Sequence, residues 1–77
     1  FNPETVIRYS VPFGVAGNVT LTVYNSLGQA VATLVDGQKE AGEHQVSFNA
    51  ADLPSGTYIY RISSGNFTET RKMILIK

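Results

Sequence analysis

Apolar and polar residues alternate along most of this chain, and this period of two limits its fold more than any other feature. Successive side chains of a β-strand point to opposite faces, so alternation predicts strands that each bury one face. Residues 19–24 give the clearest example, because Val19, Leu21 and Val23 share one face. Residues 5–11 alternate in the same way, and helical spacing is almost absent. The sequence therefore predicts an all-β chain.

Turn-forming residues separate the alternating segments at intervals of about 8 to 12 residues, which is typical of sandwiches and small barrels. Residues 25–28 predict a tight turn, because Asn25 can cap it and Gly28 can adopt a positive φ. A strand is expected to follow over 29–35. The residues expected at turns and corners are Asn25, Gly28, Gly42, Ser55, Gly56 and Gly65.

The second half of the chain continues the pattern. The polar stretch 36–42 predicts an exposed connection, after which alternation resumes at 44–48. Residues 49–56 predict an irregular corner in which Leu53 and Pro54 close the open end of the sandwich. Two further strands, 58–62 and 67–76, flank a hairpin turn around Ser64, Gly65 and Asn66. About six strands are expected in all.

Length and charge narrow the class of protein. A chain of 77 residues has room for one hydrophobic core, so we expect residues 1–77 to form a single domain. Six basic and six acidic residues give a formal net charge of zero, which argues against nucleic-acid binding. The sequence has no Cys, and its longest apolar run, 73–76, is far shorter than a membrane span. No transmembrane segment is expected.

The side chains that carry chemistry are scattered. His44 is the only histidine, and its alternation with Val46 and Phe48 indicates packing or hydrogen bonding. The carboxylates fall mostly in predicted loops, with no pair at a spacing that suits shared-proton catalysis. Residues 36–43 contain three acids without the ordered spacing of a calcium loop. We therefore assign no catalytic residue, no cofactor and no metal ligand.

A series of short motifs runs through the chain in a recognisable order. They are Phe1-Asn2-Pro3, then Val23-Tyr24-Asn25 with Gly28, then Gly42 with His44, then Leu53, Ser55, Gly56 and Tyr58, and finally Lys72, Met73, Leu75 and Lys77. This order and spacing resemble the C-terminal sorting domains of the bacterial type IX (Por) secretion system. The chain is also similar to the related immunoglobulin-like domain of flagellar hook-capping proteins.

Two positions depart from the family pattern at the first turn. Asn25 stands where the family commonly has Asp, and Gln29 stands where it commonly has Arg. An Asp and an Arg at these positions could form an ion pair. We therefore expect this chain to lack that polar contact.

The resemblance implies a fold and a function. The fold is an immunoglobulin-like antiparallel β-sandwich of about six to seven strands. The function is that of a non-catalytic C-terminal signal for secretion and cell-surface sorting. The type IX translocon would recognise this signal in the periplasm, and the protein would reach the cell surface or the medium. A surface sortase is a further implied partner, and a parent catalytic or binding domain is expected upstream.

Partner recognition is expected at the last strand, because unpaired strand edges are templates for pairing with another chain. The residues concerned are Arg71, Lys72, Met73, Ile74, Leu75, Ile76 and Lys77.

Two other functions remain open at this point. One is an accessory carbohydrate-binding or spacer module of a secreted enzyme, which would need Tyr24, Tyr60 or Phe67 exposed and coplanar on one face. The other is an assembly domain like that of the hook-capping proteins.

Overall fold

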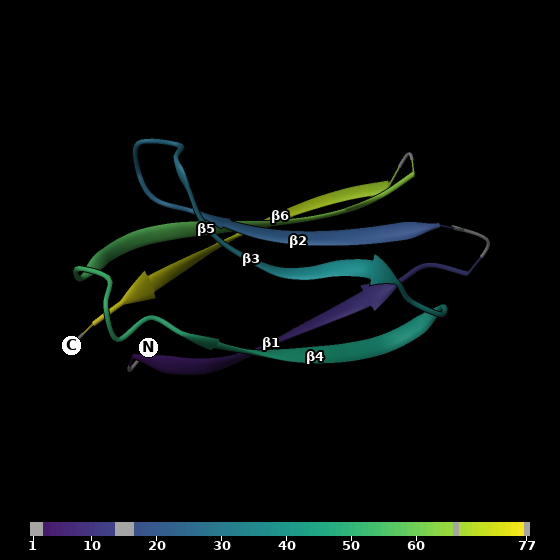
Figure 1. Cartoon of the computed structure of the whole chain (residues 1–77), viewed down its shortest axis with the longest axis horizontal. Coiled ribbons are helices and arrows are strands. Elements are labelled where there is room, and N and C mark those ends of the chain that lie inside the picture. Colours follow the sequence, from purple (N-terminus) through teal and green to yellow (C-terminus); the bar gives the residue numbers. More distant parts are fainter. Residues whose placement is uncertain (1–2, 14–16, 66, 77) are drawn as a thin grey trace.

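In the computed structural model, which describes residues 3–13, 17–65 and 67–76, the described residues form six β-strands and no helix. The strands are β1 (Glu4–Val11), β2 (Asn18–Tyr24), β3 (Ala30–Gln38), β4 (Gly42–Asn49), β5 (Gly56–Ser64) and β6 (Phe67–Leu75). Figure 1 shows them as two layers. The molecule is elongated, with extents of 38 × 21 × 16 Å. The predicted all-β fold is confirmed.

The two layers are antiparallel sheets of unequal size. The smaller sheet pairs β1 with β4, and the larger sheet has the order β3-β2-β5-β6. The chain thus leaves the small sheet after β1, enters the large one, and returns for β4 before completing the large sheet. This exchange between layers makes a sandwich rather than a single curved sheet.

The core lies between the layers and is built from the predicted inward faces. Val19, Leu21 and Val23 of β2 are fully buried, and Ile7, Tyr9 and Val11 of β1 cover them from the small sheet. The remaining buried apolar residues are Val35, Phe48, Ala50, Tyr58, Ile62 and Leu75. β3, β4 and β6 each place one buried side chain in this core, and for β6 this is Leu75, with Phe67 and Met73 half-buried beside it.

The third strand is longer than the sequence indicated. Asp36 and Gly37, which predicted the start of a loop, continue β3 and pair with Thr20 and Val19 of β2. The Asn18 side-chain amide donates to Asp36 Oδ1 at 2.8 Å and secures the end of the ladder. The predicted connection over 36–42 is therefore shortened to 39–41, because pairing with β2 outweighs the local turn preference of Asp and Gly.

The turn after β2 contains the polar contact that the sequence led us not to expect. Asn25 Oδ1 accepts hydrogen bonds from the backbone N–H groups of Leu27 and Gln29, both at 3.0 Å. Its Nδ2 donates to Gln29 Oε1 at 2.9 Å. Two amides thus bond where an Asp and an Arg could form an ion pair, and Gly28 completes the turn with a φ of 82°.

The corner before β5 is held by a tyrosine. Tyr58 is 3% exposed, and its hydroxyl donates to the backbone carbonyl of Pro54 at 2.7 Å. Leu53 is half-buried against the core, whereas Pro54 itself is exposed. Of the two residues expected to close this end of the sandwich, only Leu53 packs into it.

Candidate recognition surface

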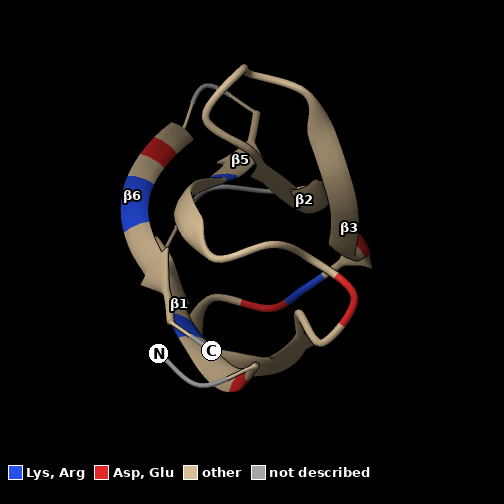
Figure 2. Ribbon diagram, turned by 90° about the vertical axis from the view of Figure 1, so that its left-hand side faces the viewer, with Lys and Arg blue, Asp and Glu red and all other residues tan. Residues whose placement is uncertain are grey.

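The last strand lies at the edge of the larger sheet. Among the described residues, β6 pairs with β5 along its whole length, from Ser64 opposite Phe67 to Gly56 opposite Leu75, and with no other strand. β1 is likewise an edge of the small sheet, and Figures 1 and 2 show that β1 and β6 lie on the same side of the sandwich. The two sheets are therefore open toward solvent on this side.

The pleat of β6 divides the residues predicted for partner recognition into two groups. Leu75 is 1% exposed and Met73 is half-buried, so these two side chains hold the strand to the core. Lys72 and Ile74 point outward and are exposed, Ile74 by 52%. Ile76, just beyond the strand, is 64% exposed. Lys77 lies outside the described residues.

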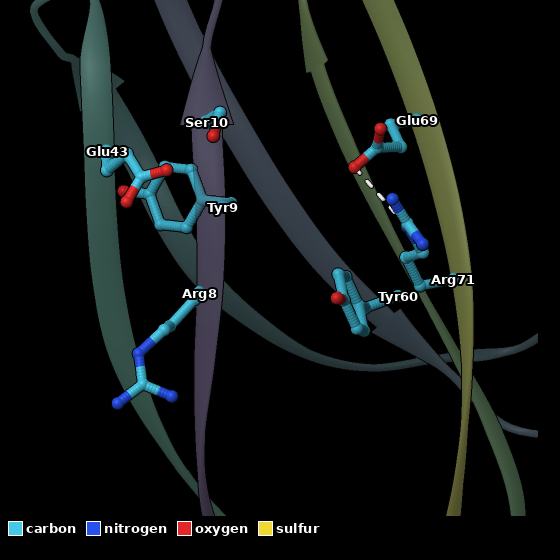
Figure 3. Close-up of a pocket in the computed structure, with 7 residues that line it drawn as sticks. All are labelled: Arg8, Tyr9, Ser10, Glu43, Tyr60, Glu69 and Arg71. Carbon is cyan, nitrogen blue, oxygen red and sulfur yellow. Dashed lines mark ion pairs between the residues drawn. The ribbon is translucent and has the colours of Figure 1, made fainter.

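Arg71 belongs to a third environment, a polar groove between the two open edges (Figure 3). The groove has a volume of about 400 Å³. Its walls are Arg8, Tyr9, Ser10 and Glu43 from the small sheet and Tyr60, Glu69 and Arg71 from the large one. On the wall formed by the large sheet, Arg71 Nε lies 3.4 Å from Glu69 Oε1, and both side chains remain well exposed.

Charged residues occupy inward positions of β6 that other strands fill with apolar side chains. Glu69 and Arg71 share the face of Phe67, Met73 and Leu75, and Figure 2 shows an acidic and a basic band next to each other on this strand. Sequence analysis missed the groove, although one signal pointed to it. Alternation in 67–76 places charges where the inward period requires apolar residues.

The histidine and its neighbours form a packed pair. The His44 ring stacks on Tyr9 with centroids 5.4 Å apart, and its Nε2 lies 2.7 Å from the carbonyl oxygen of Glu40. The predicted packing and hydrogen-bonding role of His44 is confirmed. Burial raises the pKa of the Tyr9 hydroxyl above its usual value, because the charged phenolate would lose hydration. Within the described part of the chain, no group of His, Asp and Glu is arranged to hold a metal ion.

The aromatic residues do not form the exposed platform that a sugar-binding surface requires. Tyr60 and Phe67 are half-buried against the core on the inward face. Tyr24 is half-buried on the opposite face, where the Arg61 guanidinium lies 5.3 Å from its ring centroid. These three rings therefore lie on two faces of the sheet, and none is fully exposed.

The fold defines a small β-sandwich module with two edge strands, β1 and β6, on one side. Residues 2–77 match the family described as the secretion system C-terminal sorting domain, and the chain belongs to that family. It is a C-terminal sorting signal of type IX secretion, a role that is not catalytic, and it directs export to the cell surface or the extracellular medium. Comparisons with curated proteins and with solved structures gave no match. The described residues include no helix long and apolar enough to cross a membrane.

Proposed function

We propose that the outward side of β6 and the residue beyond it, made of Lys72, Ile74 and Ile76, is the surface by which the type IX machinery recognises this chain. The observation that carries this assignment is the pleat, which buries Leu75 and leaves Ile74 and Ile76 more than half exposed. An apolar row beside a cation on an edge strand suits docking by another protein. Met73 and Leu75 act indirectly, by holding the row in place.

The remaining parts of the assignment concern the protein as a whole. Residues 1–77 act as one domain, which is attached to a parent catalytic or binding domain and directs its export. The domain itself performs no catalysis. The contacts of His44 support the lack of catalysis, because its ring already stacks on Tyr9 and its Nε2 already lies against the Glu40 carbonyl. A surface sortase is a candidate to remove the domain after export, with the strand edge accessible to it.

Point substitutions test the recognition surface better than truncation does. Deleting 73–77 removes Leu75, which is 1% exposed, and so damages the core together with any recognition site. Replacing Ile74 and Ile76 by Thr keeps β-branched side chains and strand preference while removing exposed apolar surface. Val6→Thr is the matched control, since Val6 is 45% exposed on the small sheet.

The chain is fused behind a signal peptide and a fluorescent reporter and expressed in a type IX-competent bacterium and in a strain without the system. We expect the unchanged chain and Val6→Thr to reach the surface or medium only in the competent strain. The Ile74→Thr/Ile76→Thr variant should lose export by about tenfold, the effect of one or two lost apolar contacts. Full export of the double variant would refute the assignment of this row while leaving the sorting function intact.

A further inference from the structure

We propose that the edge of β6 pairs with β6 of a second copy of this chain, so that two four-stranded sheets join across a two-fold axis. The paired segment is Phe67–Met73, which forms a ladder only with β5 among the strands that the structure describes. The inference goes beyond the recognition surface proposed above, because it concerns the purified chain alone and the groove-facing charges rather than Ile74 and Ile76.

The charges on the inward face of β6 restrict what this edge can accept. Inward-pointing charges on an edge strand generally prevent pairing with another strand, because they would lie opposite apolar or like-charged residues. Glu69 and Arg71 hold such positions, two residues apart on one face. A pairing strand must therefore place a cation opposite Glu69 and an anion opposite Arg71.

A second copy of β6 meets this requirement in one symmetric register. Antiparallel strands related by a two-fold axis normal to the sheet keep inward residues opposite inward residues. With the axis at Thr70, Glu69 of each copy lies opposite Arg71 of the partner copy, which gives two favourable pairs. Moving the axis by one residue, to Glu69 or to Arg71, places two like charges opposite each other. The charges thus select one register and disfavour its neighbours.

The other residues of the segment agree with that register. Phe67 comes to lie opposite Met73, and both are half-buried apolar residues on the inward face. Thr70 lies opposite Thr70, a pair that cross-strand hydroxyl contacts favour. Thr68 lies opposite Lys72 on the outward face, where neither side chain is repelled. All positions from 67 to 73 are therefore compatible with self-pairing.

The expected dimer is weak and sensitive to salt. Two short edges bury less surface than the roughly 1,200 Å² of a stable interface, so association belongs to the transient class. Glu69 and Arg71 remain exposed to solvent, so their attraction is screened as ionic strength rises. Association should therefore be measured from about 10 µM to about 1 mM protein at low and high salt.

The test uses sedimentation equilibrium of the 77-residue chain and charge reversals on β6. Glu69→Arg alone and Arg71→Glu alone each replace two attractive contacts by two repulsive ones, and each should weaken self-association by about tenfold. The double variant Glu69→Arg/Arg71→Glu restores opposite charges and should dimerise like the original chain. An equimolar mixture of the two single variants should form a mixed dimer, because each then supplies the charge that the other lacks.

Circular dichroism checks that each variant is folded, and hydrogen exchange shows whether β6 amides become protected as concentration rises. Rescue by the double variant and by the mixture would establish self-pairing in this register. The proposal would be overturned by a chain that stays monomeric up to about 1 mM, or by a dimer whose dissociation constant is unchanged in Glu69→Arg and in Arg71→Glu.

Discussion

At the scale of single residues, one hydroxyl joins the corner before β5 to the core. Tyr58 is buried, and its hydrogen bond to the Pro54 carbonyl ties an exposed loop to the strand that follows. Tyr58→Phe keeps the ring and removes this bond. We expect the free energy of unfolding to fall by about 0.5–1.5 kcal/mol, since the exposed carbonyl can bind water instead.

Urea unfolding of Tyr58→Phe and of Tyr24→Phe measures this difference. Tyr24 is the control because its ring, rather than its hydroxyl, contacts Arg61. An equal loss of stability in both variants would show that the Pro54 bond has no particular role.

The first turn shows how far single residues can be predicted. Asn25 and Gly28 indicate a tight turn through their residue types alone, because one caps and the other adopts a positive φ. The bond between Asn25 and Gln29 was not foreseen. Because the family's Asp and Arg are absent at positions 25 and 29, we expected no side-chain contact between them. The two amides that replace them are nevertheless close enough to bond once the turn has formed. Side-chain pairing depends on a geometry that residue types do not specify.

At the scale of elements, strand faces and most strand ends were predictable, whereas the end of β3 was not. Alternation gave the inward residues of β2 correctly and predicted the one-sided burial of β1, because one buried face requires a period of two. The end of β3 was misplaced because Asp36 and Gly37 favour turns locally, while their pairing with β2 is a contact between distant segments. The turn preferences of single residues carry no information about pairing between distant segments.

The pleat of β6 leads to a prediction at this scale. Leu75→Ala should cost about 2–5 kcal/mol, because it opens a cavity at a side chain that is 1% exposed. Ile74→Ala, one position away, should cost less than about 1 kcal/mol, since Ile74 is 52% exposed. Thermal unfolding of the two variants checks the contrast. Similar losses would mean that the strand does not keep this face toward the core.

At the scale of the whole molecule, the sequence predicts a sandwich but not which strands form its edges. The order β3-β2-β5-β6 results from pairings between distant segments, and no short motif encodes it. The groove between β1 and β6 depends on that order, because Arg8 and Arg71 line one groove only when both strands are edges on one side. The function was accessible earlier, through motifs that resemble a family. The choice of the outward residues of β6 as the proposed recognition surface required the fold.

The stability of the whole molecule should depend on pH through Tyr9, which is 6% exposed in the core and stacks on His44. Burial raises the pKa of its hydroxyl, so the folded chain holds that proton more tightly than the unfolded chain does. The stability that Tyr9 contributes is then complete below its unfolded pKa of about 10 and is lost as the pH rises through the higher folded value.

Tyr9→Phe keeps the ring without the titrating group. Urea unfolding between about pH 8 and pH 12 should show a smaller alkaline loss for the variant, because all other groups titrate equally in both chains. Parallel curves would mean that the Tyr9 hydroxyl reaches solvent in the folded state.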